Sequence, residues 1–130
     1  MKCLDTDLLV AILRRKDDAK EKADQLDREG RQATTTVNAF ELFYGAYKSR
    51  LAEENVRQTR RLLSRLLVFP LGVDSAQKAA GIFATLEKKG ARLDFRDAMI
   101  AGIALENRLP VVTRNKSDYS KVPGLSIEEW

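Results

Sequence analysis

The sequence contains no histidine, and its only cysteine is Cys3. Without an imidazole the chain cannot form a Ser–His–Asp or Cys–His catalytic group, and it cannot build a histidine-based zinc site. A lone cysteine forms no internal disulfide, which fits a cytoplasmic protein, and we expect Cys3 to be a small packed residue of a strand. Any metal ion would therefore be bound by oxygen ligands, which favours magnesium, manganese or calcium.

Long apolar segments are also missing. No stretch approaches the ~18 consecutive apolar residues that a membrane-spanning helix needs. Asp5 and Asp7 interrupt the first apolar segment, so we expect no signal peptide. The chain has 130 residues, 44% of them hydrophobic, which predicts one domain over residues 1–130 with a core of ordinary size. The net charge of +4 is a weak indication of a polyanionic partner.

Strand and helix patterns alternate along the chain. Short apolar or β-branched runs predict strands in "KCLD", "QATTTV", "VFPLGV", "PVVTRN" and "LSIEEW". Helical periodicity predicts helices over residues 6–13, 16–30, 38–52, 53–67, 74–90 and 97–109. Asn38 and either Asp74 or Ser75 are the expected N-caps of two of these helices. The alternation predicts an α/β protein with three layers (α/β/α) around a central parallel sheet of four to five strands.

Acidic residues lie where the predicted strands end. Asp5 ends the first strand, Glu41 lies one turn into the helix after the second, Asp94 and Asp97 open the apolar helix, and Asp118 follows the fourth strand. In parallel sheets the active crevice lies beyond the carboxyl ends of the strands, so these acids are expected to converge there. Clustered carboxylates repel one another unless a cation lies among them, and a hard divalent ion suits such oxygen ligands.

Each acid also has a purely structural alternative. Asp5 and Asp94 can cap the helices that follow them, and Glu41 can pair with a nearby arginine. Asp118 can be an ordinary turn residue. The coincidence of several acids at predicted strand ends favours a shared site.

The ordered motifs "LDTDLLV", "TTTVNAFELFYGA", "DFRDAMIAGIA" and "VVTRNKSDYSKVPGL" resemble those of PIN-domain ribonucleases of the VapC toxin type, found in prokaryotic toxin–antitoxin pairs. The similarity extends over essentially the whole chain. It implies a PIN-like fold and an Mg²⁺- or Mn²⁺-dependent endoribonuclease that hydrolyses RNA phosphodiester bonds. The family's catalytic, metal-binding acids match Asp5, Glu41, Asp97 and Asp118.

The resemblance also implies supporting residues and partners. Thr113 matches a hydroxyl residue that supports the first aspartate, Asp94 is expected to be an auxiliary ligand, and Asn115 is expected to assist with water or metal. Asp7 departs from the family pattern, in which many relatives have Asn or Ser. Relatives usually form homodimers and are silenced by an antitoxin protein, here a VapB-like partner.

Basic and aromatic residues flank the predicted acidic site. The expected RNA-binding residues are Arg14, Arg15, Arg96 and Arg114, whose phosphate contacts would make binding depend on salt. The basic stripe formed by Arg57, Arg60, Arg61 and Arg65 is a phosphate-binding surface or simply a solvated helix face. The aromatic residues Phe40, Phe43, Tyr44 and Tyr47 favour core packing or a dimer surface over base stacking.

Two other functions fit parts of the sequence. The "LDTD" motif also resembles haloacid-dehalogenase-like phosphatases, in which Asp5 would be the phosphorylated nucleophile, but that interpretation leaves Glu41 without a role. The second alternative is a non-catalytic RNA-binding PIN module that keeps its acids for metal-dependent structure. RNA cleavage that is lost in Asp5→Asn would distinguish the nuclease from both.

Overall fold

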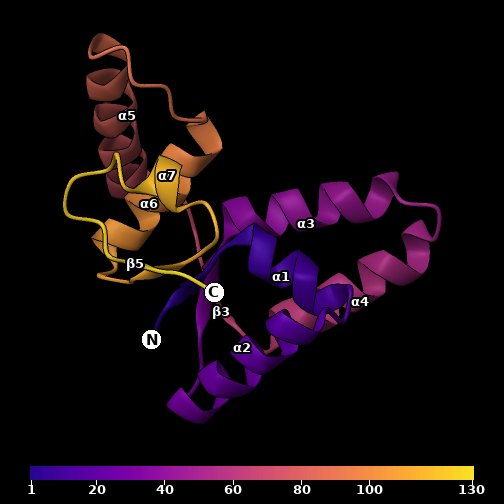
Figure 1. Cartoon of the computed structure of the whole chain (residues 1–130). Coiled ribbons are helices and arrows are strands. Elements are labelled where there is room, and N and C mark those ends of the chain that lie inside the picture. The colour runs from indigo at the N-terminus through magenta and orange to yellow at the C-terminus, as the bar shows by residue number, and fades with distance from the viewer.

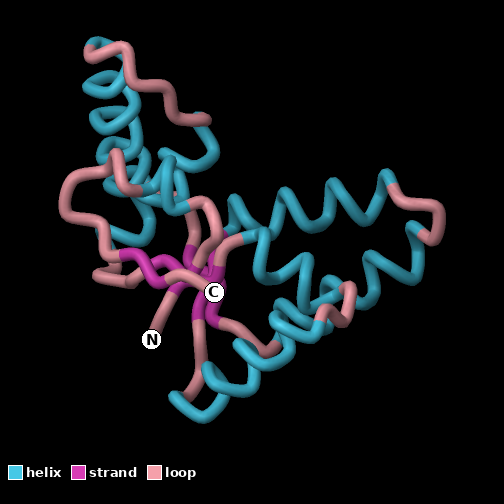
Figure 2. Tube along the Cα trace, viewed as in Figure 1, coloured by secondary structure: helices cyan, strands magenta, loops and turns pink.

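The chain folds around a five-stranded sheet in which every neighbouring pair of strands is parallel, as the computed structural model shows for all residues from Met1 to Trp130 (Figures 1 and 2). The strand order is β3-β2-β1-β4-β5. The strands are β1 (Cys3–Leu4), β2 (Ala33–Thr35), β3 (Leu67–Phe69), β4 (Val111–Val112) and β5 (Ile127–Glu128). The helices are α1 (Thr6–Leu13), α2 (Asp17–Glu29), α3 (Thr36–Lys48), α4 (Ala52–Ser64), α5 (Val73–Lys88), α6 (Phe95–Glu106) and α7 (Lys116–Tyr119).

Helices cover both faces of this sheet, which confirms the predicted three-layer α/β/α architecture. Successive residues of a strand point to opposite faces. Accordingly, Cys3 and Val111 are buried in a core shared with α5 and α6, whereas Leu4 and Val112 are buried in a second core shared with α1, α2, α3 and α4. Figure 1 shows α5, α6 and α7 on one side of the strands and α1 to α4 on the other.

The apolar helix α6 packs closely on α5. At Gly102 a Cβ atom would lie 2.6 Å from the carbonyl oxygen of Ser75, so a larger residue would push the two helices apart. The predicted N-cap of α5 was wrong, because the helix begins at Val73 and Gly72 is the cap. Ser75 instead lies in the first turn, where its hydroxyl accepts the N–H of Gly72 at 2.9 Å.

The start of α3 also differs from the prediction, and the difference matters for the site. Strand β2 ends at Thr35, whose extended backbone and hydroxyl make it the N-cap of α3. The Thr35 hydroxyl accepts the N–H of Asn38 at 3.1 Å. Asn38 is therefore not the cap but a fully buried residue of the first helical turn. The run of β-branched residues made the strand look two residues longer at its carboxyl end than it is.

Helices α3 and α4 form an antiparallel pair that projects from the body of the molecule (Figure 1). Phe40, Tyr44 and Tyr47 are exposed on α3, so core packing is wrong for these three rings, and only Phe43 packs against the core. None of the helices combines the length and the apolar character needed to cross a bilayer.

Candidate active site

Asp5 lies directly after β1 and is held by four donors, although only 6% of the residue is exposed. One oxygen, Oδ1, accepts the N–H of Thr6 at 2.9 Å, which makes Asp5 the N-cap of α1, and the side-chain amide of Asn38 at 3.1 Å. The hydroxyl of Tyr119 lies 3.4 Å from the same oxygen. The other oxygen accepts the hydroxyl proton of Thr113 at 2.7 Å. These four donors together fix the orientation of the Asp5 carboxylate.

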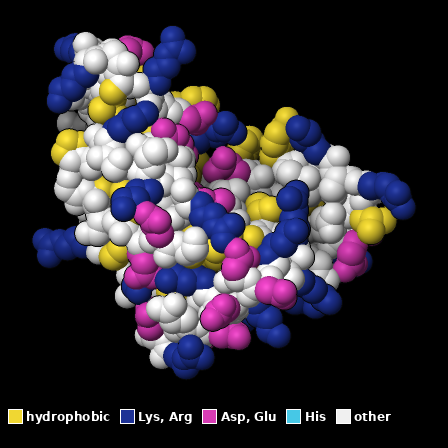
Figure 3. Space-filling view, viewed as in Figure 1, with side chains coloured by type: hydrophobic (Ala, Val, Ile, Leu, Met, Phe, Trp, Pro, Cys, Tyr) yellow, Lys and Arg dark blue, Asp and Glu magenta, His cyan; other side chains and the backbone are white.

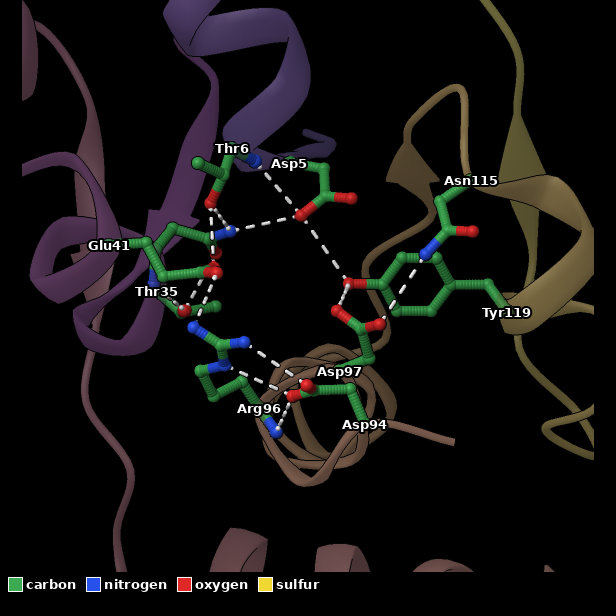
Figure 4. Close-up of polar contacts among 10 residues, drawn as sticks. Asp5, Thr6, Thr35, Glu41, Asp94, Arg96, Asp97, Asn115 and Tyr119 are labelled. Carbon is green, nitrogen blue, oxygen red and sulfur yellow. Dashed lines mark hydrogen bonds and ion pairs between the residues drawn. The ribbon is translucent and has the colours of Figure 1, made fainter. Parts of the chain in front are cut away.

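Asp97 lies in the first turn of α6 and faces Asp5 across a single hydroxyl group (Figure 4). Its Oδ1 atom lies 3.4 Å from the Tyr119 hydroxyl, the same distance that separates this hydroxyl from Asp5. Its Oδ2 atom accepts the side-chain amide of Asn115 at 3.4 Å. Two acids from distant parts of the chain thus share one donor.

Glu41 approaches the same place from α3. Its Oε1 atom accepts the Thr6 hydroxyl at 2.9 Å, and that hydroxyl in turn accepts the amide of Asn38 at 2.9 Å. Its Oε2 atom lies 3.8 Å from the guanidinium of Arg96. Glu41 therefore both pairs with an arginine and lies at the acidic site, as the two alternatives for this residue predicted.

Burial and mutual repulsion raise the pKa of the two central acids. The pKa of Asp5 rises to about 6, chiefly because the side chain is buried, and Asp7 and Glu41 raise it further against the opposing hydrogen bond from Thr113. The pKa of Asp97 rises to about 7 through burial and through repulsion by Asp5, Asp94 and Glu41. Such carboxylates are stabilised by a proton or by a cation.

Asp94 and Arg96 form the outer edge of the site. Asp94 is the N-cap of α6, because its carboxylate accepts the backbone N–H of Arg96 at 2.8 Å. The same carboxylate accepts two guanidinium N–H groups of Arg96, each at 3.1 Å, and this contact lowers the pKa of Asp94. Arg96 therefore lies between Asp94 and Glu41, with its charge next to the acids. The auxiliary metal-binding role of Asp94 stays a prediction.

The fourth predicted acid does not contact the others. Asp118 lies on α7, where its carboxylate accepts the ammonium group of Lys121 at 3.2 Å, and no hydrogen bond joins it to Asp5, Glu41 or Asp97. The same segment does reach the site through Asn115 and Tyr119. The catalytic and metal-binding roles of Asp118 stay predictions.

The predicted RNA-binding arginines have different surroundings. Arg96 borders the acids, and Arg14 lines a groove of about 220 Å³ that begins at Glu41 and runs between α3 and α4. Arg15 is exposed just beyond α1. Arg114 is already engaged, because its guanidinium stacks on the ring of Trp130 and pairs with Asp18. In the space-filling view, acidic side chains lie in the hollow between α5–α6 and α3, with Lys and Arg around it (Figure 3).

Asn38 and Tyr119 are two residues that hold the acids and that sequence reasoning missed. Asn38 had been expected to cap a helix, yet its amide joins Asp5 to Thr6, and the Thr35 hydroxyl orients that amide by donating to its oxygen at 2.7 Å. Asn38 lies three residues before Glu41 on the same helix face, and this spacing could have indicated that both side chains reach the site. Tyr119 had no signal, because a tyrosine in a short polar loop has no distinguishing pattern.

The donor set fits a hard divalent cation. Asp5, Glu41 and Asp97 supply only carboxylate oxygens, and burial together with mutual repulsion raises the pKa of Asp5 and Asp97. No three acidic side chains surround a common point as they stand. Glu41 also pairs with Arg96, so its carboxylate is shared between that guanidinium and the acidic site.

A parallel sheet with acids gathered at its carboxyl end is the arrangement of a PIN domain, and the family model for the PIN domain matches residues 2–125. The tRNA(fMet)-specific endonuclease VapC of Salmonella typhimurium is 36% identical over 100 residues, covering 77% of this chain and 76% of that relative. The enzyme of the same name from Shigella flexneri is 31% identical over 127 residues, covering 98% and 96%. A crystal structure of VapBC2 from Rickettsia felis bound to a promoter DNA fragment superposes with a TM-score of 0.89, at 27% identity and with 99% and 98% of the two chains covered.

This chain therefore belongs to the PIN domain family and, within it, to the VapC ribonucleases of toxin–antitoxin systems. That membership confirms the resemblance seen in the sequence motifs and makes the chain an endoribonuclease. It also decides against a haloacid-dehalogenase-like phosphatase. Because the match spans nearly the whole chain, it covers Asp5, Glu41 and Asp97 together with the loop that carries Thr113 and Tyr119.

Proposed function

We propose that this ribonuclease depends on Mg²⁺ or Mn²⁺ and that Asp5, Glu41 and Asp97 hold the ion. The observation that carries the proposal is the pairing of Asp5 with Asp97 across the Tyr119 hydroxyl, at 3.4 Å on each side. Asp5 is buried, Asp97 is half-buried, and the pKa of each is raised. Because the two carboxylates share one weak donor, a divalent cation would stabilise them. When bound, the ion lowers the pKa of a water molecule and stabilises the leaving oxygen of the phosphodiester.

The chain's own residues orient the ligands and receive the substrate. Thr113 and Asn38 hold the Asp5 carboxylate from opposite sides, and Asn115 steadies Asp97. Arg96, at the outer edge beside Glu41 and Asp94, is placed to pair with a phosphate of the RNA. We propose Asp118 as a fourth acid that binds a second ion or orients the water. Its carboxylate would first have to break its ion pair with Lys121.

The proposed substrate is transfer RNA, with the initiator tRNA first among candidates. Two relatives at 36% and 31% identity are named for cleavage of tRNA(fMet). The net charge of +4 and the basic residues around the acidic hollow are suited to a folded polyanion (Figure 3). We therefore also propose that the protein acts in the cytoplasm, because tRNA is found there.

Purified protein incubated with initiator tRNA, total tRNA and an unrelated mRNA tests this function. We expect one discrete cut in initiator tRNA in the presence of Mg²⁺ or Mn²⁺, no cutting with excess EDTA, and recovery when the ion is restored. Cleavage that continues unchanged in the chelator would contradict metal dependence. Binding of all three RNAs without any cleavage would favour the non-catalytic module.

We also propose a VapB-like antitoxin as the partner of this chain. The Rickettsia felis relative was crystallised as a VapBC pair. In this chain the groove that begins at Glu41 is also lined by Leu42, Arg14 and Gln58, so a peptide lying there would end at the acids. A partner segment in this groove would block access of RNA to the site.

The third partner in the proposal is a second copy of the chain, bound through the aromatic face of α3. Phe40, Tyr44 and Tyr47 are 62%, 53% and 68% exposed, and the first two rings are stacked with centroids 6.1 Å apart. Exposed, rigid aromatic rings in a row are typical of protein–protein contacts.

Light scattering on the eluting protein should therefore give about twice the monomer mass of 14.7 kDa. Tyr44→Glu should shift the population toward monomer at micromolar concentration, because it places a charge in the apolar contact. Glu21→Ser, on exposed α2, is the matched control and should stay dimeric. A monomeric wild type, or a dimer that Tyr44→Glu leaves intact, would show that the aromatic face of α3 is not a dimer interface.

A further inference from the structure

Trp130 connects two segments that lie beside the acidic site, α1 and the residues just after β4. Its indole Nε1 donates to Asp7 Oδ1 at 3.1 Å, which attaches it to α1. Arg114, just after β4, stacks its guanidinium 3.6 Å from the centroid of the indole ring and donates Nε–H to the Trp130 carbonyl oxygen at 3.1 Å. The backbone N–H of Arg114 also donates to Asp7 Oδ2 at 2.9 Å. Asp7 therefore has two N–H donors, one of them supplied by Trp130.

The hydroxyl of Thr113 lies between two carboxylates. Its oxygen is 2.7 Å from Asp5 Oδ2 and 3.1 Å from Asp7 Oδ2, and it accepts the backbone N–H of Asn115 at 2.9 Å. A threonine hydroxyl carries one proton, so it can donate fully to only one of the two carboxylates. Because Asp7 already accepts two N–H groups, the Thr113 proton is left for Asp5, and the shorter distance agrees with this.

We propose that Trp130 is a positioning residue of the active site, because its indole N–H occupies Asp7 and thereby keeps the Thr113 hydroxyl on Asp5. The inference rests on the proposed role of Asp5 as a metal ligand. Without the indole donor, Asp7 Oδ1 loses its partner. The carboxylate is then held only by the Arg114 N–H on Oδ2, so it is free to shift toward the Thr113 hydroxyl and compete for its proton. Asp5 is buried and cannot replace that donor with bulk water, so its carboxylate loses the contact that opposes Asn38.

The test removes the indole N–H while keeping an aromatic ring. Trp130→Phe retains a ring under Arg114 but has no donor for Asp7. We expect Mn²⁺ binding, followed by the electron paramagnetic resonance signal of the free ion, to weaken about tenfold, which is the usual effect of losing an outer partner of a metal ligand. The kcat for initiator tRNA should fall by a similar factor, while KM for the RNA stays within about twofold of the wild-type value.

The decisive control is the double variant Trp130→Phe with Asp7→Asn. An uncharged residue at position 7 competes less for the Thr113 proton, so Mn²⁺ affinity and kcat should recover to within about twofold of wild type. If Trp130 only holds the fold together, the double variant loses two anchoring groups and should be worse than Trp130→Phe. Melting curves of all variants show whether each remains folded.

The chain contains one tryptophan, so biosynthetic replacement by benzothienylalanine changes this side chain alone. That analogue keeps the bicyclic shape and replaces the N–H by sulfur, and it should reproduce the tenfold loss even if Trp130→Phe does not fold. A Trp130→Phe or analogue protein with wild-type Mn²⁺ affinity, or a double variant that fails to recover, would overturn the positioning role alone. A wild type that neither binds Mn²⁺ nor cleaves RNA would overturn the proposed function and this inference with it.

Discussion

Asp5→Asn and Asp97→Asn should each lower the rate of RNA cleavage at least about a hundredfold while the protein stays folded. Loss of an outer partner of a metal ligand costs about 10- to 100-fold, and loss of a ligand should cost at least as much. An amide is a poorer ligand than a carboxylate for a hard cation. Folding should survive, because the pKa values of Asp5 and Asp97 are raised to about 6 and about 7, which shows that the folded state holds both charges at a cost.

Initial rates on initiator tRNA at saturating Mn²⁺ measure this effect. Asp24→Asn, an exposed acid on α2, is the matched control and should keep the wild-type rate within about twofold, since it changes the net charge equally but lies on a different helix. An Asp5→Asn protein that cleaves at the control rate would show that this carboxylate does not hold the catalytic ion.

The metal-free protein should become less stable as the pH rises from about 5 to 8. In the folded state the pKa values of Asp5 and Asp97 are about 6 and about 7, well above the unfolded value of 3.8. The folded state therefore holds these two protons to higher pH than the unfolded chain, and the advantage is lost as the pH rises through about 6 and about 7. One pKa unit corresponds to about 1.4 kcal/mol, so we expect the melting temperature in EDTA to fall by at least about 5 °C.

Mg²⁺ or Mn²⁺ should reverse that loss, and the stabilisation should be larger at pH 8 than at pH 5.5, because protons compete with the ion for the same oxygens. In the double variant Asp5→Asn with Asp97→Asn, both the pH slope and the response to the ion should largely disappear. Calorimetric or fluorescence melting curves measure both quantities. A metal-free wild type that becomes more stable between pH 6 and pH 8, or an unchanged slope in the double variant, would contradict the assignment.

The layers of the fold and three of the acids could be predicted because local patterns determine them. Alternating short strands and amphipathic helices require a parallel sheet covered on both faces. The carboxyl ends of parallel strands share one edge, so Asp5 after β1, Glu41 in the helix after β2 and Asp97 in the helix leading to β4 had to approach one another. Here the sequence position of a residue is enough to place it.

Other parts of the site depend on contacts between segments that no local pattern connects. The Tyr119 hydroxyl reaches Asp5 and Asp97 only because α7 folds back over the edge of the sheet, and α7 is four residues long with too few positions to show a period. Asp118 has the expected sequence position, but its turn of α7 directs it to Lys121 instead. Trp130 and Asp7 meet across almost the whole length of the chain.

Arg114 illustrates a further limit of sequence reasoning. Its position beside the acids suggested contact with phosphate, yet its guanidinium is stacked on Trp130 and paired with Asp18. Arg57 and Arg65 of the basic stripe likewise pair with Glu54 and Asp27. Both pairs are exposed and contribute little to stability. Only the tertiary structure shows which cations already have partners.

Asp5, Glu41 and Asp97 are proposed to bind one divalent cation together. An anomalous difference map from crystals of the wild-type protein grown with Mn²⁺ tests this proposal most directly, because manganese scatters anomalously while carbon, nitrogen and oxygen scarcely do, so a peak identifies the ion. We predict a peak within about 2.5 Å of oxygens from Asp5 and Asp97, with Glu41 as a direct ligand or joined through water. If crystals grown at saturating Mn²⁺ show no peak between Asp5 and Asp97, or show a peak bound by other residues, these acids do not form the proposed cation site.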